Sequence, residues 1–144
     1  MFRRRGRWIG LLGLLLAGLS ACTGTSGRAY ALAPVDVLPE QVRQAPAPVQ
    51  EAYRFAVANP EVLTQLPCYC GCGAMGHTSN YACYVAGENP DGTLRFDDHA
   101  LGCSICVDIT QDAMRMLDEG KSLDEIRAYV DRTYSRFGPS NMEP

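Results

Sequence analysis

Residues 67–73 read Pro67-Cys68-Tyr69-Cys70-Gly71-Cys72-Gly73, with three cysteines at alternate positions. Two cysteines separated by one residue form a disulfide with each other only under strain, because disulfide geometry is narrow. The same spacing suits thiolates that converge on one soft cation or on neighbouring soft cations. The glycines permit backbone angles that a loop wrapping around an ion requires. We therefore interpret the rest of the chain as a scaffold that brings further metal ligands to this stretch.

Further sulfur and imidazole donors lie downstream of this stretch. Cys103 and Cys106 are three residues apart, so they share a face if a helix covers them. His99 joins the same face if that helix begins at Asp98, although Gly102 weakens its continuity. The predicted metal ligands are Cys68, Cys70, Cys72, Cys103 and Cys106, followed by His77, Cys83 and His99.

The chemistry of these donors predicts copper(I), with zinc as the alternative. Zinc is satisfied by four ligands in a tetrahedron, whereas the stretch and its downstream partners offer six thiols. Copper(I) is a soft ion, and thiolates can bridge several copper(I) ions, so a copper site can use all six thiols. The sequence contains no evident nucleophile with a base, phosphate-binding loop or pair of convergent carboxylates. We therefore predict a binding protein without catalytic residues.

The first residues of the chain predict export and lipid attachment. Residues 1–7 carry four arginines and no acid, and residues 8–19 form a short apolar run, as in a secretory signal. Leu19-Ser20-Ala21-Cys22 resembles the bacterial lipobox, in which the cysteine becomes the lipid-modified first residue. We expect residues 1–21 to be removed and fatty acids such as palmitate to hold Cys22 in the cell membrane, at its extracytoplasmic face.

Charge and cysteine number limit the classes of partner. Removal of residues 1–21 leaves nine basic and sixteen acidic residues, a net charge of −7, which argues against nucleic acid as a partner. The chain has seven cysteines, and six remain if Cys22 is lipidated. An even number in an exported protein is also typical of a disulfide framework. A disulfide-stapled interaction module without chemistry therefore remains an alternative, and the sequence identifies no protein partner.

The apolar pattern predicts a mostly α fold in four parts. Residues 1–21 are the signal, and residues 22–47 hold scattered glycines and prolines that are typical of a flexible tether. Residues 48–138 form the Cys-rich helical domain, and residues 139–144 form a loose tail.

Within the domain, local signals predict the element ends. Ser122-Leu123-Asp124-Glu125 is a capping box, so the last two helices form a helical hairpin. The turn signal at residues 88–92 predicts a minor β-hairpin between residues 81–85 and 93–96, after a glycine- and cysteine-rich loop. The predicted helices run from Pro48 to Asn59, from Glu61 to Leu66, from Asp98 to Gly120 and from Ser122 to Gly138.

Residues 67–72 match letter for letter the motif of a bacterial family, the PCYCGC-motif proteins, which are often predicted lipoproteins. The chain is similar to this family also through Gly76-His77, Cys83-Tyr84-Val85, His99 and Cys103-Ser104-Ile105-Cys106. The resemblance implies membership of a family whose biochemical function is poorly assigned. The expected role, copper(I) binding for capture, delivery or detoxification, therefore comes from the ligands.

Residues 114–138 resemble the helical hairpin of thiol reductase subunits in cytochrome c maturation, which also carry Cys-x-x-Cys before the hairpin. In this chain Cys103 and Cys106 lie closer to the hairpin than in that family. Because such a pair can be tuned for exchange, the resemblance implies a thiol–disulfide oxidoreductase or thiol-handling factor as an alternative function. This alternative predicts a lowered thiol pKa and no tightly bound metal.

Overall fold

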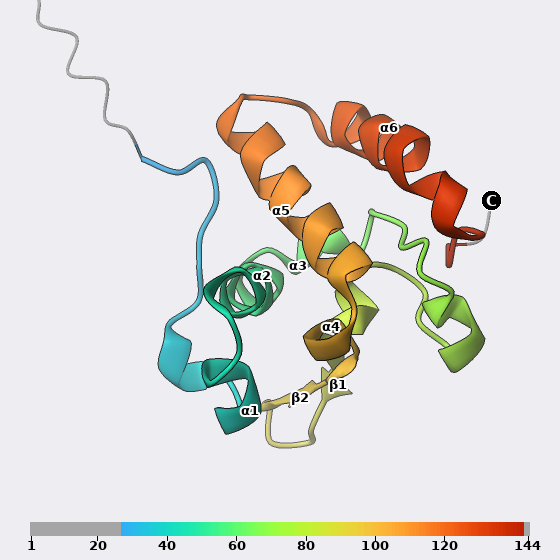
Figure 1. Ribbon diagram of the computed structural model, residues 1–144. Coiled ribbons are helices and arrows are strands. Elements are labelled where there is room, and N and C mark those ends of the chain that lie inside the picture. The colour runs from blue at the N-terminus through green and yellow to red at the C-terminus, as the bar shows by residue number, and fades with distance from the viewer. Residues whose placement is uncertain (1–26, 143–144) are drawn as a thin grey trace, which may run out of the picture.

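Figure 1 shows the computed structural model, which describes residues 27–142. The expected signal and the lipid site at Cys22 lie outside the described residues. No helix among the described residues has the length and apolar character needed to cross a membrane. The described helices and strands are α1 (Glu40–Arg43), α2 (Ala47–Ala58), α3 (Pro60–Leu63), β1 (Val85–Glu88), β2 (Leu94–Phe96), α4 (His99–Gly102), α5 (Ser104–Asp118) and α6 (Leu123–Tyr134).

The core lies where α2 packs against α5 (Figure 1). Tyr53 and Phe55 of α2 are fully buried, as are Ile109 and Ala113 of α5. The ring of Tyr53 stands edge-on to that of Tyr84, with the two centroids 4.9 Å apart. Burial of these large apolar side chains supplies the main driving force for folding, and the predicted mostly α class is confirmed.

The predicted helical hairpin is confirmed in α5 and α6. Gly120 adopts a left-handed φ of 75° just beyond α5, a conformation that glycine reaches at little cost. The side-chain hydroxyl of Ser122 accepts a hydrogen bond from the backbone N–H of Glu125 at 3.3 Å. The Glu125 carboxylate accepts one from the backbone N–H of Ser122 at 2.9 Å, which completes the capping box.

The predicted minor hairpin is also present. Strands β1 and β2 pair antiparallel, with Glu88 opposite Leu94, and a register shift between Val85 and Gly87 marks an irregularity in β1. Residues 81–83 form a 3-10 turn and not the start of an extended segment. Directly after β2 the chain continues through Asp97 into α4, and both contribute residues to the site described below.

The described part of the predicted tether differs from a flexible linker. Leu38 and Val42 are buried in the core, at 3 % and 1 % exposure, and Val42 belongs to α1. The backbone N–H of Ala33 donates to the carbonyl of Arg54 at 3.0 Å, and the Arg54 guanidinium donates back to the carbonyl of Ala33. These apolar and hydrogen-bonded contacts fix the segment to α2, so the helical domain begins before residue 48.

The predicted loose tail is wrong for its described residues. The backbone N–H of Asn141 donates to the carbonyl of Cys68 at 3.1 Å, so the tail lies against the cysteine loop. Gly138 brings the two segments together, because a Cβ at this position would lie 2.9 Å from the carbonyl oxygen of Tyr69. The tail therefore belongs to the folded domain through this backbone contact.

The close approach at Gly138 generates a test. Gly138→Ala should lower the free energy of unfolding by about 1–3 kcal/mol, because the added methyl group overpacks against the backbone of the loop. Urea unfolding of the reduced protein measures this change. Gly102→Ala is the matched control, since a Cβ there meets open space and the stability should stay within about 0.5 kcal/mol. Equal stability of the two variants would contradict the close packing of the tail.

Candidate metal centre

The cysteine-rich loop begins at Pro67, directly after the buried Leu66. Gly71 has a φ of 86°, and this left-handed angle turns the chain into a 3-10 turn over Cys72–Met75. The turn ends at Gly76, whose φ of 89° is also left-handed. The two glycines thus allow the sharp turn that carries Cys72.

The second source of ligands is the junction of α4 and α5. The backbone of Cys103 is extended, with φ −122° and ψ 101°, so the continuous helix predicted from Asp98 to Gly120 is broken here. Cys103 occupies the N-cap position of α5, and Cys106 lies in its first turn. His99 belongs to α4, a separate short helix before the break, and it does not share a helical face with these thiols. The change of chain direction at Cys103 brings His99 beside them.

Seven of the predicted donors gather in two neighbouring groups, and within each group the ligand atoms all lie within 4.8 Å of one another. The four-donor group is Cys70, His99, Cys103 and Cys106, and the three-thiol group is Cys68, Cys72 and Cys83. In the first, Cys70 Sγ is 3.3 Å from His99 Nε2 and 3.6 Å from Cys106 Sγ. In the second, Cys72 Sγ is 3.6 Å from Cys83 Sγ.

The two groups touch through Cys68. Its Sγ lies 3.3 Å from the Sγ of Cys106 and 3.4 Å from that of Cys70. The three-thiol group is fully buried, whereas Cys70 and Cys103 of the four-donor group are half-buried. All six thiols are free in the structure. The arrangement is one soft-donor cluster, buried at the three-thiol end and partly open at the other, that could hold metal ions.

His77 lies beside the cluster and outside both groups. Its ring is perpendicular to the ring of His99, with centroids 5.2 Å apart. Its Nε2 is 3.4 Å from Oδ2 of Asp97, whose Oδ1 accepts a hydrogen bond from the backbone N–H of His99 at 2.8 Å. The carboxylate of Asp97 therefore contacts the ring of His77 and the backbone of His99.

Contacts within the cluster lower the pKa of one thiol and raise the pKa of others. Hydrogen bonds from Cys106 and then Cys83 lower the pKa of the Cys68 thiol far below its ordinary value, because they stabilise its thiolate. Burial raises the pKa of Cys70, and the neighbouring Cys68 thiolate raises it further. The hydrogen bond with Cys68 also raises the pKa of Cys106. These contacts therefore favour the thiolate form at Cys68 and the protonated form at Cys70 and Cys106.

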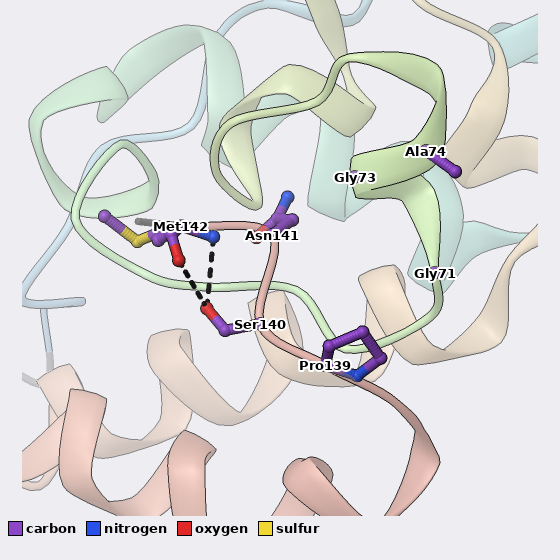
Figure 2. A pocket seen from close by; sticks show the side chains of 7 residues that line it. All are labelled: Gly71, Gly73, Ala74, Pro139, Ser140, Asn141 and Met142. Carbon is purple, nitrogen blue, oxygen red and sulfur yellow. Dashed lines mark hydrogen bonds between the residues drawn. The ribbon is translucent and has the colours of Figure 1, made fainter. Parts of the chain in front are cut away.

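Asn141 is a site residue that the sequence reasoning missed. Its Oδ1 accepts a hydrogen bond from the backbone N–H of Cys68 at 2.7 Å. Its Nδ2 donates to the carbonyl of Ser79 at 3.0 Å and to Sγ of Cys72 at 3.5 Å. Figure 2 shows Asn141 beside a hollow of about 620 Å³ between the cysteine loop and the tail. No motif or periodicity marks this asparagine.

A second set of unpredicted residues supports α5 at Cys106. The carbonyl of Cys106 accepts hydrogen bonds from the Tyr84 hydroxyl at 2.8 Å and from Asn80 Nδ2 at 3.3 Å. The Thr110 hydroxyl donates to Oδ1 of Asn80 at 2.9 Å. Asn80, Tyr84 and Thr110 are all fully buried, so this polar network is satisfied internally and fixes the start of α5.

The fold and the site define a small α-helical domain with a buried cluster of cysteines and histidine. The chain belongs to the family described as protein of unknown function with PCYCGC motif, which matches residues 29–141, and this confirms the predicted family. The matched region includes all seven clustered donors and Asn141. Comparisons with curated proteins and with solved structures gave no match.

The hydrogen bonds of Asn141 predict a stabilising role for the tail. Asn141→Ala should lower the free energy of unfolding by about 1–3 kcal/mol, because the buried partners on Cys68 and Ser79 lose their hydrogen bonds. Urea unfolding of the reduced, metal-free protein measures the change. Ser140→Ala is the control in the same segment, since the hydrogen bonds between the Ser140 hydroxyl and the Met142 backbone are local and exposed (Figure 2). An Asn141→Ala variant as stable as this control would contradict the role.

The acidity of Cys68 predicts a thiolate at low pH. At a pH of about 5, well below the ordinary thiol pKa of about 8.5, the reduced metal-free protein should absorb in the ultraviolet as one thiolate per chain. The folded pKa of Cys68 is lowered, so this thiolate persists as pH falls until the folded pKa is reached. Cys68→Ser should remove the absorbance, and Cys103→Ser should retain it. Absence of thiolate absorbance in the folded wild type would contradict the assignment.

Proposed function

We propose that this protein is a membrane-anchored, extracytoplasmic lipoprotein that binds copper(I) for capture, delivery or detoxification. The observation that carries the proposal is the position of Cys68 Sγ within 3.4 Å of thiols from the other group. Thiolates this close can bridge neighbouring copper(I) ions, and thiolate ligands select soft metals. The cluster thus suits two or more ions that share sulfur ligands.

The three-thiol group favours copper(I) over zinc. Cys68, Cys72 and Cys83 are each at most 1 % exposed, so water has no access as a further ligand. Zinc takes four ligands in structural sites, whereas copper(I) is stable with three thiolates. The four-donor group, with three thiols and His99, matches either metal. The fully buried half of the cluster therefore supports the choice of copper.

The membrane location rests on the sequence. The arginine-rich start, the apolar run and Leu19-Ser20-Ala21-Cys22 support export and acylation of Cys22. A lipid there would hold the metal-binding domain at the outer face of the membrane without a spanning segment. Copper delivered from outside the cytoplasm would meet the cluster directly.

One observation favours thiol–disulfide exchange as a second candidate function. Cys103 is half-buried at the N-terminal end of α5, and Cys106 is buried three residues later. In such an arrangement the partly exposed thiol at the helix N-terminus can attack a substrate disulfide, and the buried thiol can then resolve the mixed disulfide. Here the buried Cys106 also contacts Cys68, which makes the pair part of the larger donor set.

Native mass spectrometry separates these functions. Residues 23–144, exported without the lipid and purified without chelators, should retain two or more copper(I) ions with the thiols reduced. Joint substitution Cys68→Ser, Cys70→Ser and Cys72→Ser should abolish retention, because it removes ligands from both groups. Met116→Leu is the control, since it removes a buried sulfur from α5 with little change of volume.

The measured masses, together with a thiol-exchange assay, also distinguish the alternative functions. Each disulfide lowers the mass by two hydrogens, so three disulfides and no metal would reject copper binding and favour a stapled module. Zinc retained in preference to copper(I), when both are offered, would reject the choice of metal. Rapid exchange of Cys103 and Cys106 with a disulfide reagent, without bound metal, would support the oxidoreductase.

A further inference from the structure

A second feature near the cluster concerns how the metal arrives. Met75, His77, Tyr81 and Asp97 are among the residues that line a hollow of about 440 Å³. The hollow is distinct from the one between the loop and the tail that Figure 2 shows. It lies next to the four-donor group, because the ring of His77 contacts the ring of His99.

His77 has the properties of a free ligand at this hollow. Its side chain is 11 % exposed, and its buried Nδ1 finds no hydrogen-bond partner among the described residues. Its Nε2 lies 3.4 Å from Oδ2 of Asp97, and a proton on that nitrogen, facing the carboxylate, leaves a lone pair on Nδ1. Histidine ligands are commonly oriented in this way by a carboxylate behind the ring. An unpaired buried nitrogen otherwise costs stability, which a bound metal ion would repay.

Met75 supplies a second soft donor at the same hollow. It is 58 % exposed and precedes His77 by two residues in the glycine-rich loop. A thioether and an imidazole bind copper(I) but discriminate against hard cations. Both are neutral ligands, so an ion held by them passes readily to thiolates.

We propose that this hollow is an uptake site in which Met75 and Nδ1 of His77 receive copper(I) before it enters the cluster. The inference rests on the proposed function. The transfer is a ligand exchange: the bonds from copper to Met75 and His77 break as bonds to His99 and Cys70 form, and copper stays copper(I). His99 Nε2 and Cys70 Sγ lie 3.3 Å apart, so the ion meets both on leaving His77. Any thiol proton displaced goes to solvent.

Stopped-flow absorbance of copper(I) leaving its bicinchoninate complex tests the uptake site, with the reduced full chain in detergent micelles. His77→Phe keeps a ring beside His99 but removes both nitrogens, and it should slow loading by about tenfold or more. The final number of ions and their affinity should match the wild type, because His77 belongs to neither donor group. Met75→Leu should also slow loading, and Met142→Leu, at the other hollow, should not.

His77→Gln, which is smaller and polar, guards against misfolding of the phenylalanine variant and should slow loading similarly. Unchanged loading rates in both His77 variants would overturn the uptake site while leaving copper binding intact. Loss of one ion or of equilibrium affinity in either folded variant would also overturn it, because His77 would then be a permanent ligand. A wild-type chain that takes no copper would remove the proposed function itself.

Discussion

The contact between the thiols of Cys68 and Cys106 joins the cysteine loop to α5, and the rest of the structure supports it from both sides. Asn141 holds the backbone of Cys68, while Tyr84 and Asn80 hold the carbonyl of Cys106. Buried thiols also pack as small apolar groups, so the cluster extends the hydrophobic core between α2 and α5. Site and core are therefore one packed unit.

This support comes from hydrogen bonds and packing that join segments far apart in the chain. The tail, the buried network around Asn80 and the break at Cys103 together place seven donors in one cluster. Ligands that the surrounding fold holds in place lose less conformational freedom when they bind an ion, which favours tight binding.

Local signals in the sequence sufficed for much of the fold. Asn59-Pro60 and the Ser122 capping box act within a few residues, so the corresponding helix ends could be predicted. The donors could be named from residue type and spacing. The positions of Leu38, Val42 and Asn141 could not be predicted, because their contacts join segments far apart in the chain. The break at Cys103 also arises from packing, and Gly102 gave only a weak indication of it.

Under the proposed function, the order of donors from surface to core gives copper a direction. Met75 is exposed, His77 and Cys70 are both partly buried, and Cys68 is fully buried. Neutral thioether and imidazole ligands thus precede thiolates, which bind soft ions more strongly. The free energy of the ion falls inward, so capture is favoured and spontaneous release is not. Delivery would require a partner whose own thiolates reach the half-buried edge at Cys70 and Cys103, where ligands can be exchanged without unfolding the core.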